Sequence, residues 1–257
     1  MERRTSRYLL YYSLRFILIL LSATIDIVLP CYNPAEGWGI SVVDKMIELR
    51  EMLPEVECRL IVVDDGSSTG VNDVNIQTIK GSIPLTKVIR CSENQGKGAA
   101  LRKGIKSANA DYIIYTDVDF PYTLKSLLAI YNDLLEGFDI VAGIKDDTYY
   151  HSVPAGRRFI SRFLRGMTRL FLGLKITDTQ CGLKGMNAKG RDVFLSTTID
   201  RYLFDLEFIY LASHNKEIQL TARTIQLRDS ISFSKMPLKI LVQEGFNFVR
   251  IIFKRFA

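Results

Sequence analysis

The sequence contains little histidine and cysteine, and this limits the chemistry that it can support. Its 257 residues include only two histidines, His151 and His214, and no two cysteines form a CxxC pair. A histidine-rich metal centre, a Ser-His-Asp site and a cysteine-ligated zinc site are therefore not expected. Any metal must be held mainly by carboxylates, which favours Mg²⁺ or Mn²⁺. We expect the four thiols to be reduced and mostly buried: Cys31, Cys58, Cys91 and Cys181.

Long uncharged apolar runs and an excess of proline or glycine are also missing. With 7 Pro, 17 Gly, 47% apolar and 24% charged residues, the chain is typical of one globular domain rather than of a disordered or collagen-like protein. No window offers the roughly 20 uncharged apolar residues that span a bilayer. The net charge of +6 indicates anionic partners, such as a nucleotide, a phosphate or an acidic membrane surface.

The two ends of the chain differ from the rest. Residues 1–24 form an N-terminal apolar and basic extension that resembles a signal peptide in outline. It runs almost directly into a strand-like segment, so we interpret it as an interfacial or packing helix, or as an over-extended start, rather than a membrane span. Residues 236–257 are predicted to form a basic amphipathic helix, which either lies on a bilayer or docks on the core.

Between these ends, short β-rich runs alternate with helical stretches. Strands are expected at 26–30, 57–63, 86–90, 111–116 and 138–143, and helices at about 38–53, 72–80, 96–108 and 123–136. This order predicts an α/β, Rossmann-like domain over residues 25–235, with a mostly parallel central sheet flanked by helices. Ligands bind at the carboxyl ends of the strands in such sheets, so we expect the functional residues there.

Two aspartates follow the fourth expected strand. Asp117 and Asp119 are separated by Val118, directly after an apolar run. Two carboxylates so spaced can bind a ribose hydroxyl and a divalent cation that bridges a diphosphate. The alternative is a pair of solvated loop residues, but the position at the ligand-binding edge favours the functional interpretation.

The second expected strand also ends in adjacent acids, Asp64 and Asp65. They form either an ordinary capped turn or a site in which one carboxylate accepts a hydrogen bond from a nucleobase N–H, a donor of both uracil and guanine. Adjacent like charges are costly without partners, which favours the second interpretation.

A glycine-rich stretch at 94–100 is typical of a phosphate-binding helix start with Lys97 beside it. It matches neither a GxGxxG dinucleotide fingerprint nor a Walker motif, which argues against a dehydrogenase and a P-loop ATPase.

Residues 155–175 are the main basic segment of the chain. Its arginines share one helical face and its apolar residues another. The segment is either a solvated surface helix or a clamp for an anionic lipid head group. No aromatic platform or recognition module supports nucleic-acid binding.

Taken in order, IVLPCYNP, IVVDDGSS, NQGKGAALRKG, DYIIYTDVDF, DTQCGLKG and RDSISFSK resemble family-2 glycosyltransferases of the GT-A fold. The similarity is greatest to dolichyl-phosphate mannose synthase and bacterial polyprenyl-phosphate glycosyltransferases. The GKGxAxRxG stretch is also similar to dolichyl-phosphate glucosyltransferases, which use UDP-glucose. The resemblance implies inverting transfer of a hexose from a nucleotide sugar, of GDP-mannose or UDP-glucose type, to a polyprenyl phosphate.

The resemblance also implies roles for individual residues. It places the metal, Mg²⁺ or Mn²⁺, on Asp117 and Asp119, and it makes Asp119 and Arg157 the catalytic pair. The nucleotide would be bound by Pro30, Tyr32, Val62, Asp64, Asp117 and Val118. The diphosphate and the acceptor phosphate would be bound by Lys145, Arg157, Ser161, Arg228 and Lys235. The family pattern is broken at Pro34, Pro121 and Leu203, which leaves the donor sugar open.

A polyprenyl phosphate needs no general base because a phosphate monoester is already anionic near neutral pH, its second pKa being about 6. A sugar hydroxyl would need one, for which Asp205 and Glu207 are the candidates, although a structural role is the simpler interpretation of both. We therefore expect a cytoplasmic enzyme that associates peripherally with the inner face of the cell membrane and binds no nucleic acid. Two alternatives stay open: a glycosyltransferase that extends a cell-surface polysaccharide, and a non-catalytic membrane-surface protein with a vestigial nucleotide site.

Overall fold

The computed structural model describes residues 23–145, 166, 168–174, 176, 178–228, 247–249 and 251–252. Most of the N-terminal extension therefore lies outside the described residues. Among the helices within them, none combines the length and the apolar character that crossing a bilayer requires.

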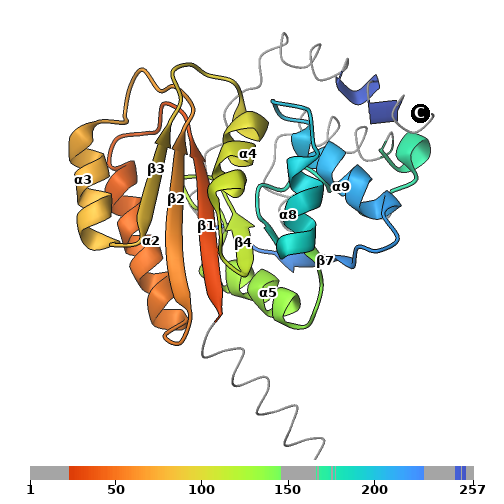
Figure 1. Cartoon of the computed structure of the whole chain (residues 1–257), viewed down its shortest axis with the longest axis horizontal. Helices are drawn as coiled ribbons and strands as arrows, with labels where there is room; N and C mark the ends of the chain where they lie inside the picture. Colours follow the sequence, from red (N-terminus) through yellow and green to blue (C-terminus); the bar gives the residue numbers. More distant parts are fainter. Residues whose placement is uncertain are drawn as a thin grey trace, which may run out of the picture.

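In the described part of the chain, a seven-stranded sheet forms the centre of the molecule, in the order β3-β2-β1-β4-β6-β5-β7. Figure 1 shows β3, β2, β1 and β4 side by side. Only β6 runs antiparallel to its neighbours, β4 and β5, and the other strand pairs are parallel. This confirms the predicted mostly parallel α/β sheet. The strands are β1 (Thr24–Cys31), β2 (Glu57–Asp64), β3 (Thr86–Arg90), β4 (Tyr112–Tyr115), β5 (Ile140–Lys145), β6 (Lys184–Met186) and β7 (Leu220–Ile225).

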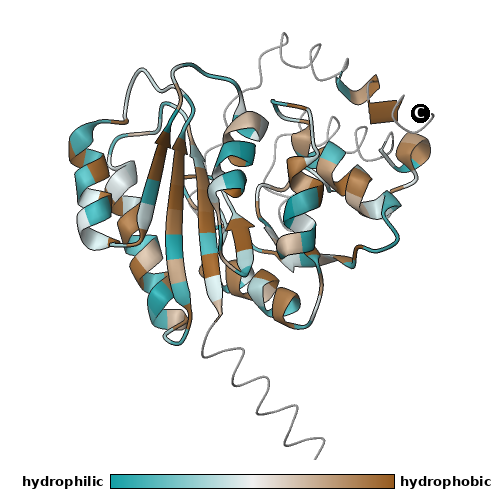
Figure 2. Ribbon diagram, in the orientation of Figure 1, coloured by the Kyte–Doolittle hydropathy of each residue, from teal (hydrophilic) through white to brown (hydrophobic). Residues whose placement is uncertain are grey.

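Helices cover both faces of the sheet, and each face has its own apolar core. One core joins the sheet to α2 (Trp38–Met52), α3 (Asp73–Ser82) and α5 (Leu124–Leu135). The other joins it to α4 (Lys97–Ser107), α8 (Ala188–Leu195) and α9 (Phe204–His214). Successive side chains of a strand point to opposite faces, so Ile27 packs in the first core and Val28 in the second. The buried strands are correspondingly rich in apolar residues (Figure 2).

The C-terminal segment contributes to the second core. Phe248 and Ile251 are buried among the side chains of α9 and of Leu172 and Leu174, while Val249 is exposed. Of the two interpretations of this amphipathic segment, docking on the core is the one that its described residues support.

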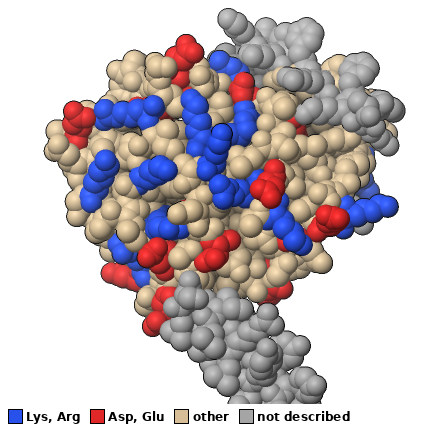
Figure 3. All heavy atoms as spheres, viewed as in Figure 1, with Lys and Arg blue, Asp and Glu red and all other residues tan. Residues whose placement is uncertain are grey.

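Basic side chains gather on the face that carries α4 (Figure 3). Lys87 of β3 donates to the carbonyl of Ser107, and Arg191 of α8 donates to the carbonyl of Lys106. Both contacts lie at the C-terminal end of α4, where unpaired carbonyls and the helix dipole favour cations. Stabilisation of the helix end accounts for these two cations.

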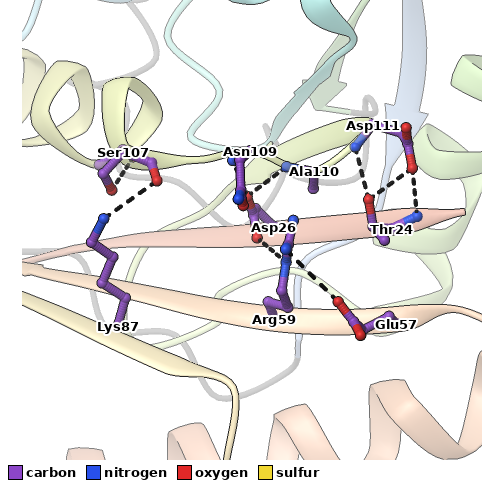
Figure 4. A network of polar contacts seen from close by, with 10 residues as sticks. Thr24, Asp26, Glu57, Arg59, Lys87, Ser107, Asn109, Ala110 and Asp111 are labelled. Carbon is purple, nitrogen blue, oxygen red and sulfur yellow. Dashed lines mark hydrogen bonds and ion pairs between the residues drawn. The ribbon is translucent and has the colours of Figure 1, made fainter.

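The amino-terminal ends of the strands are joined by a polar network (Figure 4). The buried carboxylate of Asp26 accepts hydrogen bonds from the backbone N–H groups of Asn109 and Ala110, at 2.9 and 3.0 Å, and from Arg59 Nε at 2.9 Å. Asp111 accepts from the backbone N–H and the hydroxyl of Thr24. This network fixes the turn between α4 and β4 at the end of the sheet opposite to the strands' carboxyl ends.

Candidate active site

The carboxyl end of β4 carries the two aspartates that the sequence singles out. The strand ends at Tyr115, and a turn closes when the N–H of Phe120 donates to the carbonyl of Asp117 at 2.9 Å. Phe120 adopts φ 45°, which is unusual for a non-glycine residue, and its ring is buried and anchors the turn. Asp117 is partly exposed and Asp119 is exposed, so both carboxylates are accessible at the predicted edge.

Lys97, at the start of α4, forms an ion pair with Asp117. Burial acts to lower the pKa of Lys97, but the negative charges of Asp117 and Asp205 outweigh it and the pKa is raised. Although Asp119 reaches the surface, partial desolvation of its carboxyl group by neighbouring atoms and the negative charge of Asp117 raise its pKa. The two carboxylates thus repel each other, and additional positive charge at this point would stabilise both.

The donor set fits a hard divalent cation. Carboxylate oxygens are the ligands that Mg²⁺ and Mn²⁺ prefer, and such cations are commonly held by one or two carboxylates together with substrate phosphates and water. Asp117 and Asp119 supply the two carboxylates. The described residues contain no cluster of three or more His, Cys, Asp or Glu side chains arranged to hold a metal without such additional ligands.

The glycine-rich start of α4 was predicted to bind phosphate through its backbone amides, but several of these amides donate to acceptors within the chain. Gly96 N donates to Asp65, and the N–H groups of Gly98 and Ala99 donate to the carbonyl of Asp200, at 2.7 and 3.2 Å. A Cβ at Gly98 would lie 2.5 Å from the carbonyl oxygen of Ile199, so glycine permits this close packing. These amides already have acceptors, and the contribution of the stretch to the site is the side chain of Lys97.

The adjacent acids at the end of β2 have different surroundings. Asp65 is buried and accepts from Asn94 Nδ2, Gln95 N and Gly96 N at 2.8 to 3.0 Å, so it fixes the loop before α4. Asp64 accepts from Ser67 N at 2.9 Å through one oxygen, Oδ1. Of the two, Asp64 is the better candidate for a contact with a nucleobase.

The other residues predicted to bind the nucleotide lie around this strand end. Pro30 pairs with Val63 in the sheet, and Cys31 pairs with Asp64, so the ends of β1 and β2 are adjacent. Tyr32 is exposed and Pro30 is partly buried. Val62, by contrast, is fully buried, and its side chain packs in the first core.

Asp205 and Glu207 are buried in structural contacts. Asp205 accepts from Lys184 Nζ at 2.7 Å and from the Tyr115 hydroxyl at 2.5 Å. Glu207 accepts from the N–H groups of Thr198 and Ile199, both at 2.8 Å. These contacts support a structural role for both acids rather than a role as general base.

Residues 26–193 match the family described as glycosyl transferase family 2, which is more than half of the chain. The chain belongs to this family. It is 28% identical to a dolichyl-phosphate beta-glucosyltransferase of Drosophila melanogaster over 210 residues, and 30% identical to that of Homo sapiens over 207 residues. These matches cover 76% and 75% of this chain, which spans 64% of the length of each relative.

A solved structure of the same fold is that of glucosyl-3-phosphoglycerate synthase from Mycobacterium tuberculosis in complex with Mg²⁺ and uridine diphosphate. The TM-score is 0.62 at 19% identity, and the match covers 91% of this chain and 79% of that one. The likeness supports the expected GT-A fold.

The family-2 region contains most of the predicted site. Asp64, Asp117, Asp119 and Lys145 all lie at the carboxyl ends of its strands. Lys145 ends β5 and lies against Asp178, with Nζ 3.8 Å from Oδ1 and its backbone N–H donating at 2.8 Å.

Arg228 comes from beyond the matched residues and contacts the aspartate turn. Its Nη2 donates to the carbonyl of Asp119 at 2.6 Å, and its Nε is buried without a hydrogen-bond partner in the described part of the chain. Arg157, Ser161 and Lys235 lie outside the described residues, and their roles stay predictions.

Sequence reasoning missed Gly182 and the buried Lys184. A Cβ at Gly182 would lie 2.6 Å from Asp117 Oδ2, so the backbone of Gly182 lies against the carboxylate. Lys184 is fully buried on β6. A single lysine within the apolar CGLKGM run was the available signal for it.

Proposed function

We propose that this chain is an inverting glycosyltransferase that moves a hexose from a nucleotide sugar to a polyprenyl phosphate. The observation that carries the proposal is the arrangement of Asp117 and Asp119 at the carboxyl end of β4, with Lys97 and Arg228 in contact with them. Two carboxylates beside two cationic side chains suit a metal-bound diphosphate better than a neutral ligand.

The donor would bind across the ends of β1, β2 and β4. Asp64 would accept the ring N–H of the base, and Tyr32, which is exposed beside it, offers an aromatic surface. Both curated relatives are named as glucosyltransferases, and the solved structure of this fold holds uridine diphosphate. A UDP-hexose is therefore the first donor to test, with GDP-mannose as the alternative.

Asp117 and Asp119 would hold Mg²⁺ or Mn²⁺, which when bound neutralises the diphosphate and stabilises the charge of the leaving group. Arg228 fixes the backbone of Asp119 and adds positive charge at the same turn. Lys97 balances the charge of Asp117 through their ion pair. These chain residues orient the donor and hold its leaving group in place.

The reaction would be a single displacement. A phosphate oxygen of the acceptor attacks the anomeric carbon, a new C–O bond forms there, and the bond to the donor diphosphate breaks. The electron pair leaves with the nucleoside diphosphate, and the configuration at the anomeric carbon inverts.

The surroundings of Asp205 and Glu207 favour a phosphate as acceptor. A sugar hydroxyl must lose a proton to a base, and these two acids are the candidates that the sequence offers. Both are buried and engaged, Asp205 by Lys184 and Glu207 by backbone amides. An acceptor phosphate is already ionised near pH 7 and needs neither.

A lipid-linked acceptor also suits the surface beside the second core. Leu170 is 75% exposed, and Phe171 and Arg169 next to it are exposed as well. Apolar side chains beside a cation are typical of a peripheral contact with an anionic bilayer. We therefore place the enzyme at a membrane surface, with the cytoplasmic face as the expected side.

The proposal is tested by titrating the chain with UDP-glucose and GDP-mannose in a calorimeter, with Mn²⁺ and with a chelator. We expect metal-dependent binding of one of them, which Asp119→Ala abolishes and which the exposed control Asp44→Ala leaves unchanged. Binding that needs no metal would contradict the role of the aspartates, and no binding would indicate a vestigial site.

Transfer of the labelled sugar then identifies the acceptor. Dolichyl phosphate, undecaprenyl phosphate and short glycans are offered in parallel with the donor that binds. We expect product only with the lipid phosphates. Transfer only to a glycan hydroxyl would replace the proposed acceptor with the polysaccharide alternative.

A further inference from the structure

A buried ammonium group lies behind the aspartate turn. Lys184 on β6 has no exposed surface, and its Nζ lies 5.7 Å from the centre of the Tyr115 ring. Burying a charge is unfavourable unless it is paired and hydrogen-bonded. The other residues of this strand are a glycine and a methionine, so packing alone does not explain a lysine at this position.

Lys184 is fully satisfied by acceptors from two directions. Nζ donates to the carbonyl oxygens of Thr179 and Cys181, at 3.0 and 2.5 Å, and to Asp205 Oδ1 at 2.7 Å. Asp205 in turn accepts from the Tyr115 hydroxyl at 2.5 Å. The ammonium therefore ties the loop before β6, residues 178–183, to α9 and to the last residue of β4.

This loop forms one wall of the Asp117 site. The backbone of Gly182 lies against Asp117 Oδ2, and its N–H donates to the Tyr122 hydroxyl at 3.0 Å. Lys184 thus holds the carbonyls of Thr179 and Cys181, which lie three positions and one position before the glycine that contacts the carboxylate. A shift of the loop would alter where Asp117 lies relative to Lys97.

We infer that Lys184, with Asp205 as its counter-ion, is a positioning residue for the donor site. It acts through the 178–183 loop on the Asp117 carboxylate and does not contact the substrate. The inference rests on the proposed function, because it assumes that Asp117 binds the metal-bound diphosphate. Its test therefore also needs a readout that is independent of nucleotide binding.

The chain supplies a matched control for the loss of a buried ion pair. Asp26 is also buried and pairs with Arg59, but at the amino-terminal ends of the strands (Figure 4). We compare Lys184→Met/Asp205→Asn with Arg59→Met/Asp26→Asn. Removing both partners of a pair together avoids an uncompensated buried charge.

The first readout is the affinity for UDP and for GDP in the presence of Mn²⁺, measured by calorimetry well below the unfolding temperature. Loss of groups that orient a metal ligand typically weakens binding about 10- to 100-fold. We expect a weakening of this size for Lys184→Met/Asp205→Asn. We expect wild-type affinity for Arg59→Met/Asp26→Asn, whatever its loss of stability.

The second readout is the reactivity of the loop's own thiol. Cys181 is fully buried, and burial raises its pKa, so it should resist iodoacetamide in the wild-type protein. Burial also raises the pKa of Cys31 to about 12 and that of Cys58 to about 11, and these two thiols are internal references. Loosening the loop should expose Cys181 alone, as peptide mass spectrometry would show.

A milder pair of variants covers the case in which the double variant does not fold. Tyr122→Phe removes only the hydroxyl, which accepts from Gly182 N and also hydrogen-bonds the Cys181 side chain. Tyr131→Phe is its control, because the buried Tyr131 hydroxyl has no hydrogen-bond partner among the described residues. We expect weaker Mn²⁺-dependent nucleotide binding for Tyr122→Phe only. Nucleotide binding is the readout for this pair, because the lost hydroxyl itself contacts Cys181.

The outcomes separate this inference from the proposed function. Wild-type affinity in the Lys184 and Tyr122 variants, together with an unreactive Cys181 in the Lys184 variant, would overturn the positioning role. If the Arg59–Asp26 control loses nucleotide affinity to the same extent, the effect of Lys184 is explained by its general structural role. If the wild-type protein binds neither UDP nor GDP, the proposed function fails, and selective labelling of Cys181 still decides whether Lys184 holds the loop.

Discussion

Substituting Gly182 by alanine tests the geometry of the site with one added methyl group. The backbone of Gly182 does not adopt a positive φ, so alanine fits its conformation. The new Cβ would lie 2.6 Å from Asp117 Oδ2 and 3.4 Å from Lys97 Nζ. Ordinary contacts begin at about 3.4 Å, so the carboxylate has to move away by roughly 0.8 Å.

A displacement of about 1 Å at a positioning group can reduce the rate of an enzyme about 100-fold. This corresponds to about 2.7 kcal/mol of transition-state stabilisation. Overpacking adds a loss of stability of about 1–3 kcal/mol. We therefore expect Gly182→Ala to fold, to lose about 100-fold in kcat/KM for the donor, and to bind Mn²⁺ and nucleotide more weakly.

The assay compares Gly182→Ala with Gly81→Ala in steady-state transfer and in thermal unfolding. Gly81 is exposed in α3, and a Cβ there meets no atom within 4 Å. Alanine at this position should leave kcat/KM unchanged and raise stability by about 0.5–1 kcal/mol. Wild-type activity of Gly182→Ala would show that the position of Asp117 does not matter, and would refute the role assigned to that carboxylate.

Three further predictions concern stability. Partial desolvation and the charge of Asp117 raise the pKa of Asp119, so its ionised form disfavours folding above that pKa, and this effect disappears as the pH falls. Asp119→Asn should therefore raise the Tm more at pH 7 than at pH 4. An equal rise at both pH values would contradict the direction of the pKa shift. Asp65→Ala leaves the N–H groups of Gln95 and Gly96 without an acceptor and should lower the unfolding free energy in urea by about 3 kcal/mol. Ile251→Ser should lower it by about 3 kcal/mol if the C-terminal segment docks on the core, whereas a segment lying on a bilayer predicts no change without lipid.

The first five strands were predictable because each is a short run rich in β-branched or aromatic residues and is followed by a turn or loop. The expected strand at 57–63 and the expected helix at 38–53 differ from β2 and α2 by one residue at one end. The sheet order was harder to predict from the sequence, because β6 is only three residues long and contains Lys184 and Gly185. A strand of that composition has no alternating pattern, and it is the long-range pairing with β4 and β5 that forms it.

The position of the site was predictable for a related reason. Parallel strands bring their carboxyl ends to one edge, so the acids at the ends of β2 and β4 had to lie along the same edge of the sheet. The contribution of the 178–183 loop was not predictable, because nothing local in its sequence indicates that its backbone contacts Asp117. Such contacts depend on how β6 enters the sheet, and they become visible only in three dimensions.

Residue type alone also cannot separate a functional acid from a structural one. Asp64 and Asp65 are neighbours in the chain, yet Asp65 accepts two backbone N–H groups and a side-chain amide, and Asp64 accepts one backbone N–H. An acid whose oxygens are filled by fixed donors stabilises the fold and has little capacity left for a ligand. Asp119, by contrast, lies at the surface, and its pKa is raised because neighbouring atoms partly desolvate its carboxyl group and because Asp117 repels its charge. A carboxylate kept in such surroundings weakens the fold in the absence of a cation, and this is the physical reason to assign it to binding rather than to structure.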